Sequence, residues 1–152
     1  MIEPREITRS NVDDMLQLEV REDQQHLVAP NPVTIAQAHY RPHCWLRGLW
    51  VNEEPVGLMA MIDRPGLGDD DPPKAAYLWR LMIDMNHQGK GYGREAISLA
   101  FEQARRWRRV ILCVHVCQGE GNALELYRRF RLEPTGRIDN EEIFLAGPVT
   151  EP

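Results

Sequence analysis

A glycine-rich turn, set between an apolar segment and a long amphipathic one, limits most strongly what this chain can fold into. The turn consists of Gln88, Gly89, Lys90, Gly91, Tyr92 and Gly93, with Leu81, Met82 and Ile83 before it and Arg94 after it. Glycines allow a backbone to approach an anion closely, and the first N–H groups of a helix, together with its dipole, favour negative charge. Lys90 and Arg94 add positive charge. The sequence therefore predicts an anion site where a strand passes into a helix.

Two other phosphate-binding motifs agree less well with this turn. A P-loop requires serine or threonine directly after its glycine-lysine pair, whereas Gly91 follows Lys90. Residues 91–96 do match the dinucleotide fingerprint GxGxxG/A, but that fold places the turn after its first strand and needs an acidic residue about 20 positions on. Here several strand segments precede the turn, and the next one ends at Val114–Cys117 without a carboxylate. A dinucleotide-binding oxidoreductase is therefore kept only as an alternative.

Hydropathy patterns predict a mixed α/β fold in a single domain over residues 1–152, a length typical of one domain. Strand patterns cover residues 5–8, 45–51, 55–62, 75–83, 110–114 and 142–145, with a hairpin turn at 52–54. Helix patterns begin at Ser10, at Thr34 and near Gly93, and a last one covers residues 123–130, ended by Pro134 and Gly136. Residues 20–25 either continue the first helix or end it. This order indicates α+β or α/β with a mixed sheet.

Composition argues against several classes of protein. The formal net charge of −5 and the isoelectric point of 5.5 disfavour a general nucleic-acid binder. The longest apolar run, Val56–Ile62, has seven residues, whereas a membrane span needs about 18, and the N-terminus carries no apolar signal segment. The three cysteines Cys44, Cys113 and Cys117 cannot all pair, so a reducing, cytoplasmic location is expected.

Cys113, His115 and Cys117 alternate along one strand pattern, which places their side chains on one face. Three such ligands suggest zinc, but evenly spaced residues on one strand diverge, and a fourth ligand is not apparent. A cysteine–histidine nucleophile lacks a third group to orient the base. We therefore expect these residues to pack in the core and expect no metal.

Charge is distributed unevenly along the chain. Residues 1–40 carry three basic and seven acidic side chains, a balance of −4, whereas residues 93–137 carry nine arginines and five glutamates, a balance of +4. This asymmetry suggests a cationic partner at one end and an anionic partner at the other. Two differently solvated surfaces would give the same pattern, so both interpretations stay open.

The turn at residues 88–93 resembles the Q/R-x-x-G-x-G/A motif of the GCN5-related N-acetyltransferases. The segment Leu81–Asp84 before it, and Ala123–Tyr127 after the next strand, are similar to the same family, and the resemblance covers nearly the whole chain. Residues 20–31 and 80–84 resemble the bacterial diamine (spermine/spermidine) acetyltransferase branch. The resemblance implies a central mixed, mostly antiparallel sheet with helices on both faces.

The resemblance also implies a site for acetyl-coenzyme A. The pyrophosphate would lie on the turn, and N–H groups at the end of the strand near Ile83 would bind the acetyl carbonyl. Tyr127 would donate a proton to the departing thiolate. The implied cofactor-binding residues are Leu81, Met82, Ile83, Gln88, Gly89, Lys90, Gly91, Tyr92, Gly93, Arg94 and Asn122.

The acceptor implied by this resemblance is a primary amine, and the acidic balance of residues 1–40 favours a small polyamine such as spermidine or spermine. About one alkylamine in 10³ is neutral at pH 7, so a base is needed, acting through water or in a partly desolvated site. Glu22 is the candidate, with a solvated helix glutamate as its alternative. A non-catalytic acyl-coenzyme A sensor is the main rival function, and a homodimer is left open.

Two positions depart from the family pattern. The family usually has an asparagine seven residues before the tyrosine, holding the pantetheine arm, but this chain has Glu120 there, and Asn122 lies only five before Tyr127. Either the helix entry shifts its register or Asn122 has another role, such as capping. Arg131 stands where the family usually has glycine.

Overall fold

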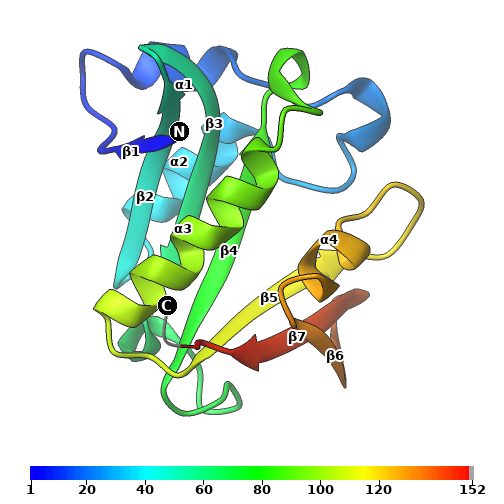
Figure 1. The fold of residues 1–152 in the computed structure, drawn as a ribbon. Coiled ribbons are helices and arrows are strands. Elements are labelled where there is room, and N and C mark those ends of the chain that lie inside the picture. The colour runs from blue at the N-terminus through cyan, green and yellow to red at the C-terminus, as the bar shows by residue number, and fades with distance from the viewer. Residues whose placement is uncertain (151–152) are drawn as a thin grey trace.

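A seven-stranded sheet forms the centre of the computed structural model, which describes residues 1–150 (Figure 1). The strands are β1 (Glu3–Arg5), β2 (Cys44–Val51), β3 (Glu54–Ile62), β4 (Ala75–Ile83), β5 (Ile111–Cys117), β6 (Glu133–Asp139) and β7 (Glu142–Pro148). The α-helices are α1 (Val12–Gln17), α2 (Asn31–His39), α3 (Tyr92–Arg106) and α4 (Leu124–Arg128). Short 3-10 helices are η1 (Glu22–Gln24), η2 (Arg64–Gly66) and η3 (Met85–His87).

The sheet is mixed and mostly antiparallel. Its strands lie in the order β1-β2-β3-β4-β5-β7-β6, and among the strands of residues 1–150 only β4 and β5 pair in parallel. A parallel pair needs a crossover connection, and α3 supplies it. The predicted fold class is confirmed.

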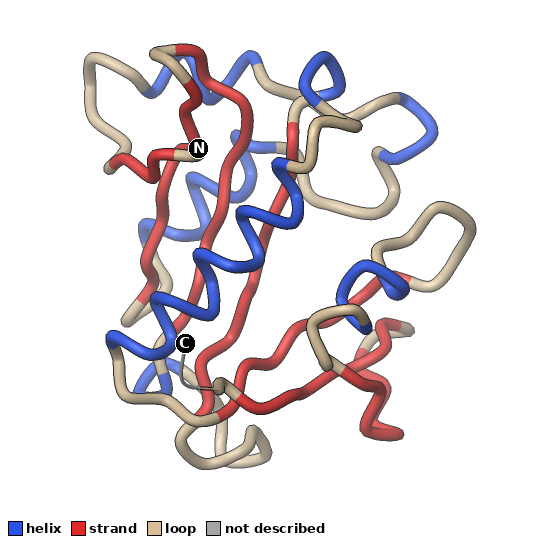
Figure 2. The backbone as a smooth tube through the Cα atoms, viewed as in Figure 1, coloured by secondary structure: helices blue, strands red, loops and turns tan. Residues whose placement is uncertain are grey.

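Helices cover both faces of the sheet (Figures 1 and 2). On one face, α3 and α4 cover the larger core; α3 buries the stripe that its spacing predicted, formed by Ala96, Ile97, Ala100, Phe101 and Ala104. On the other face, Met15 of α1 and Ile35 of α2 pack around Trp50, Leu58 and Met82. Within residues 1–150, no helix has the length and apolar character that crossing a membrane requires.

β4 and β5 pair at one end only. Their register begins at Ala75 with Ile111 and stops at Leu78 with Val114. On its other edge β4 contains a bulge, because its register with β3 steps from Leu78 directly to Arg80 and leaves Trp79 without a partner. A bulge bends its strand and increases the local twist. β4 therefore turns away from β5 beyond Leu78, as Figure 1 shows.

Some element boundaries differ from the sequence-based predictions. The first strand lies at Glu3–Arg5 instead of residues 5–8. The second helix begins at Asn31, before Thr34, because Pro32 occupies its first turn, where proline is well tolerated. Residues 20–25 do not continue the first helix, which ends at Gln17.

The strand β6 is absent from the sequence-based prediction. Pro134 and Gly136 were expected to end a helix, but both lie inside β6. This strand is at the edge of the sheet, where proline is tolerated because no second neighbour needs its N–H. Its pairing with β7 is interrupted between Pro134 and Ile138.

Candidate active site

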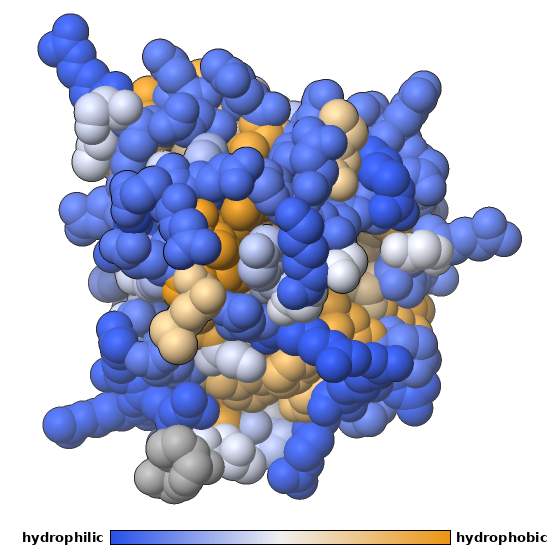
Figure 3. Space-filling view, turned by 45° about the horizontal axis from the view of Figure 1, so that its top comes forward, coloured by the Kyte–Doolittle hydropathy of each residue, from blue (hydrophilic) through white to orange (hydrophobic). Residues whose placement is uncertain are grey.

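A cleft of about 750 Å³ opens where β4 and β5 separate. Its walls are the second half of β4, the end of β5, the glycine turn and the segment of residues 24–30. Tyr127 of α4 lines it from one face of the sheet, and Arg80, hydrogen-bonded to Thr34 of α2, lines it from the other. The cleft therefore connects the two faces. Figure 3 shows apolar surface in a hollow between hydrophilic borders.

The glycine turn has the backbone that an anion site needs. Gly89 and Gly91 have φ angles of 77° and 86°, a region that residues with a Cβ adopt at a cost. A Cβ built on either glycine would meet no atom within 4 Å, so the space above both is open. Gly91 is the N-cap of α3, and its neighbours in the turn therefore present N–H groups without helical partners to this space.

Side chains of the turn have different surroundings. Nε2 of Gln88 donates to the backbone oxygen of Ile83 (3.0 Å) and to the side-chain Oε1 of Gln24 (2.9 Å), and Oε1 of Gln88 accepts from Arg21 (2.7 Å). Gln88 thus ties the turn to β4 and to η1. Lys90 is exposed and lies outside the cleft lining, whereas the side chain of Arg94 belongs to it.

The free edge of β4 presents backbone groups to the cleft. The Asp84 N–H donates to Val56 O at 2.8 Å, and bonded and non-bonded pairs alternate along antiparallel strands. Met82 therefore points its peptide groups at β3, and its side chain is buried in the core beneath α1 and α2. The peptide groups of Leu81 and Ile83 point the other way, into the cleft.

Tyr127 lies on α4 with 7% of its surface exposed, and it lines the cleft. Among residues 1–150, every wholly buried side-chain oxygen or nitrogen has a hydrogen-bond partner. The Tyr127 hydroxyl has no partner among these residues, so it is not wholly buried and reaches the cleft space. Burial raises the pKa of this hydroxyl well above its ordinary value. The group therefore carries its proton at neutral pH.

Asn122 lies directly before Ala123, the N-cap of α4. Its Oδ1 accepts from the Leu124 N–H and its Nδ2 donates to Cys117 O, both at 3.2 Å. Asn122 thus joins the end of β5 to the first turn of α4 without being its N-cap, and it also lines the cleft. Glu120 is exposed and lies outside the lining.

The structure does not bring Glu22 into the cleft. Glu22 is exposed on η1, and none of the seven acidic side chains of residues 1–40 lines the cleft. The carboxylate that does line it is Glu142 of β7, which accepts a hydrogen bond from the Cys117 thiol at 3.1 Å. Glu142 belongs to no motif, and Arg80 was noted only within the segment 80–84, without a role in the site.

Tyr77 and His115 also line the cleft, on the face away from α3. The Tyr77 hydroxyl lies 2.6 Å from His115 Nδ1, and His115 Nε2 lies 2.8 Å from Asp139 Oδ2. Residues 1–150 contain no group of three or more histidine, cysteine or acidic side chains placed to hold a metal ion. Cys113 is buried in the core, as expected, whereas His115 faces the cleft.

The family model described as the acetyltransferase (GNAT) family matches residues 11–131. The chain belongs to this family. No curated protein sequence matches it. Among solved structures, this GNAT chain is similar to an aminoglycoside acetyltransferase in complex with coenzyme A, at 14% identity and a TM-score of 0.77 over 97% of this chain and 95% of that one.

Two further GNAT-like structures show the same fold. The ribosomal-protein-S18-alanine N-acetyltransferase from Escherichia coli has 13% identity and a TM-score of 0.69 over 100% of this chain and 96% of that one. An acetyltransferase from Bacillus subtilis in complex with CoA has 14% identity and a TM-score of 0.68 over 97% of each chain. The predicted family and fold are confirmed, and the polyamine branch stays a prediction.

Proposed function

We propose that this protein transfers the acetyl group of acetyl-coenzyme A to a primary amine by direct attack in a ternary complex. The observation that carries the proposal is the single cleft in which the glycine turn, the free edge of β4 and Tyr127 meet. Two of the similar structures are complexes with coenzyme A, which supports the choice of cofactor. Acetyl-coenzyme A supplies the thioester, and no metal is proposed.

The chain's own residues fit this cofactor in two places. The open space above Gly89 and Gly91, at the start of a 15-residue helix, suits the pyrophosphate. The N–H group of Leu81 or that of Ile83 suits the acetyl carbonyl oxygen, on which negative charge develops during attack. The two N–H groups are two residues, about 7 Å, apart along the strand, so the oxygen accepts from one of them. Arg94 adds positive charge near the phosphates. Met82 and Gln88 would act indirectly, by holding β4 and the glycine turn in position. The peptide groups of Met82 pair with β3, and the side chain of Gln88 is hydrogen-bonded to Ile83 and Gln24.

Tyr127 would protonate the departing thiolate. Its hydroxyl faces the cleft from α4, on the same face of the sheet as the glycine turn. Because burial raises its pKa, Tyr127 is a weaker acid than a free phenol and would give up its proton only as the thiolate forms. Asn122 would form part of the cleft wall near Tyr127, and its hydrogen bonds to Cys117 and Leu124 would fix the start of α4.

The amine would enter from the opposite face, past residues 24–30. The resemblance and the acidic balance of residues 1–40 favour a small polyamine, although the lining contributes one carboxylate, Glu142, beside Arg80. Because Glu22 is exposed and lies outside the cleft, it could act as the base only by accepting the amine proton through a water molecule. A cytoplasmic location and a single domain over residues 1–152 belong to the same proposal.

The deciding experiment is a thiol-release assay with acetyl-coenzyme A and a panel of polyamines, amino acids, aminoglycosides and peptides. We expect amine-dependent release of coenzyme A, greatest for spermidine or spermine. A non-catalytic acyl-coenzyme A sensor would bind the cofactor in calorimetry and release no thiol with any amine. That result would replace the proposal with the sensor function.

A further inference from the structure

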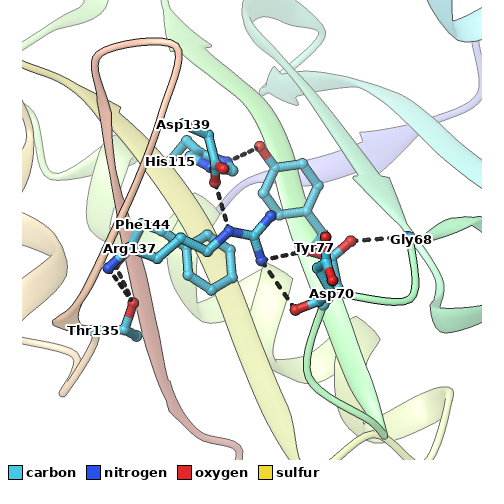
Figure 4. A network of polar contacts seen from close by, with 9 residues as sticks. Gly68, Asp70, Tyr77, His115, Thr135, Arg137, Asp139 and Phe144 are labelled. Carbon is cyan, nitrogen blue, oxygen red and sulfur yellow. Dashed lines mark hydrogen bonds and ion pairs between the residues drawn. The ribbon is translucent and has the colours of Figure 1, made fainter.

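A chain of hydrogen bonds leads from the cleft to solvent (Figure 4). Tyr77 and His115 line the cleft and are 2.6 Å apart at the hydroxyl and Nδ1. His115 Nε2 is 2.8 Å from Asp139, whose side chain is 38% exposed. The three residues come from β4, β5 and β6. Their side chains thus connect the interior of the cleft to the surface of the molecule.

The strand pairing fixes this chain at the point where the cleft opens. Tyr77 pairs with Cys113 just before the last parallel pair, and His115 is the first residue of β5 beyond it. The imidazole also contacts the Phe144 ring, with centroids 5.0 Å apart. His115 therefore has little freedom to turn away from Tyr77.

Arg137 holds the outer end of the chain in place. Its Nε donates to Asp139 at 2.6 Å and its Nη1 to Asp71 at 2.9 Å, while the guanidinium lies 4.4 Å from the centre of the Phe144 ring. Hydrogen bonds from His115 and Arg137 lower the pKa of Asp139, against a smaller effect of burial. Asp139 therefore stays ionised at neutral pH and accepts from both neighbours.

These partners determine where the imidazole carries its proton. Ionised Asp139 accepts only, so neutral His115 carries its hydrogen on Nε2 and donates it to the carboxylate. Nδ1 is then unprotonated and accepts from the Tyr77 hydroxyl. A proton acceptor thus contacts the hydroxyl of a residue that lines the cleft.

We propose that Tyr77, His115 and Asp139 form a proton relay that deprotonates the acceptor amine. This inference rests on the proposed function. As the ammonium gives one proton to the Tyr77 oxygen, the hydroxyl proton moves to His115 Nδ1, and the resulting imidazolium is paired with Asp139. The neutral amine then forms its C–N bond to the acetyl carbon while the C–S bond breaks.

The protons balance over one turnover. The thiolate takes the proton of Tyr127. The substrate nitrogen loses its second proton when the amide forms, and that proton returns to Tyr127 through solvent. The His115 imidazolium gives the first proton up to solvent and returns to its neutral form, with its remaining hydrogen on Nε2 and donated to Asp139. The sum is an ammonium and a thioester giving an amide, a thiol and one proton. Tyr77 is thus a catalytic residue, and Asp139 and Arg137 are positioning residues.

The pH dependence separates this relay from a structural network. The titratable or charged groups around it are Arg41 after α2, Asp71 in the loop before β4, Arg80 on β4, Cys113 and Cys117 on β5, Arg137 on β6 and Glu142 on β7. With the relay, kcat at saturating amine should change little between pH 7 and 9. Without it, only amine that is already neutral reacts, so kcat should rise about tenfold per pH unit, because alkylamines titrate near 10.4.

The test compares Tyr77→Phe, His115→Gln and Asp139→Asn with wild type, using acetyl-coenzyme A and spermidine, or the best amine of the panel. Exposed residues outside the cleft give matched controls, Tyr40→Phe and His39→Gln. We expect Tyr77→Phe and His115→Gln to lower kcat at pH 7 by about 10²-fold, in the range for general base catalysis, with the steeper pH profile. Asp139→Asn should show the same profile with a loss of about tenfold or more, because an amide can donate to Nε2 and move the imidazole proton to Nδ1.

Each outcome decides a different point. Circular dichroism checks that the variants fold. If Tyr77→Phe does not fold, Asp139→Asn, at a partly exposed position, provides the test of the relay. Folded variants with wild-type kcat and an unchanged pH profile would overturn the relay and leave the proposed function standing. A wild-type protein that acetylates no amine at any pH would overturn both. Loss of kcat with an unchanged pH profile would overturn the relay in favour of a structural role.

Discussion

At the scale of single residues, Gly91 is the position where one substitution best separates cofactor binding from folding. Gly91→Asp would place a side chain and a negative charge in the open space where the pyrophosphate is proposed to lie. We expect coenzyme A affinity to fall by about 100-fold, close to 3 kcal/mol. Isothermal titration calorimetry measures it.

Gly136→Asp is the matched control for this change. Gly136 also has a positive φ, 93°, and open space around its missing Cβ, but it lies on β6 outside the cleft lining. The two variants therefore share the backbone strain and differ in position. Equal coenzyme A affinity in both would move the cofactor away from the turn.

Tyr127 is the residue on which acid catalysis depends in this proposal. Tyr127→Phe removes one oxygen and keeps the ring, so the core and coenzyme A binding should be retained. We expect kcat to fall by about 10²-fold, the low end for general acid catalysis, because a thiol of pKa near 8.5 needs only modest help from an acid. Steady-state kinetics with the best amine measures this loss.

The control for Tyr127→Phe is again Tyr40→Phe, which should leave kcat unchanged. Single-turnover measurements must show that the acetyl transfer step limits kcat, since a slow product release would hide the effect. If transfer is rate-limiting and kcat stays within about threefold of wild type, Tyr127 has only a packing role.

Sequence alone located some of these residues and not others, for physical reasons. Gly89, Gly91 and Tyr127 belong to motifs whose spacing follows from one turn and one helix. Tyr77 and His115 are 38 positions apart in the sequence and meet only because β4 and β5 pair in parallel. No local pattern reports such a pairing, so their contact had to come from the structure.

At the scale of elements, an ion pair fastens the sheet at the closed end of the cleft. Asp63, after β3, accepts from Arg109, before β5, at 2.6 and 3.0 Å. Burial alone would raise the pKa of Asp63, but the hydrogen bonds from Arg109 and from the Arg64 N–H, together with the charges of Arg109 and His43, outweigh it, and the pKa is lowered. The pair therefore stabilises the fold above the ordinary aspartate pKa.

We expect Asp63→Asn to lower the free energy of unfolding at pH 7 by about 1–2 kcal/mol. The difference from wild type should shrink as the pH falls below about 4, the ordinary aspartate value, and vanish below the folded pKa, because Asp63 is then protonated in both states. Urea denaturation at a series of pH values measures it. Glu102→Gln, in the exposed pair with Arg106, should cost under about 0.5 kcal/mol. Equal effects at pH 7 and in acid would contradict this account.

Element prediction succeeded where one hydropathy period dominates and failed at edges. The buried face of α3 was predicted because burial on one side of a helix imposes a regular pattern. The hairpin of β2 and β3 was predicted because two apolar runs flank the short polar turn at 52–54. β6 was missed because an edge strand tolerates Pro134 and Gly136, which elsewhere signal a turn. The bulge at Trp79 has no sequence signature, although it helps to open the cleft.

At the scale of the whole molecule, the acidic charge of residues 1–40 lies outside the cleft lining, and its nearest members in the sequence, Glu22 and Asp23, precede the lining residue Gln24 on η1. Such charge acts on a polycation at long range and is screened over about 10 Å at 0.1 M salt. We expect the KM for spermidine to rise severalfold between 0.05 and 0.5 M salt, at saturating acetyl-coenzyme A.

A neutral amine of similar length provides the comparison for this measurement, since its KM should hardly change with salt. If neutral amines are acetylated as efficiently as spermidine at every ionic strength, the polyamine acceptor is wrong. The transfer proposal itself would stand, because it depends on the cleft and not on the charge of residues 1–40.

The partial pairing of β4 and β5 has one more consequence, which concerns hydration. Backbone groups that lack a protein partner must hydrogen-bond to water, so the inner edge of a central strand is wet before any ligand arrives. An acetyl carbonyl bound as proposed, at the N–H of Leu81 or of Ile83, would displace this water, and water would return when the product leaves. The middle of this sheet, usually the driest part of a protein, is where the molecule exchanges solvent for substrate.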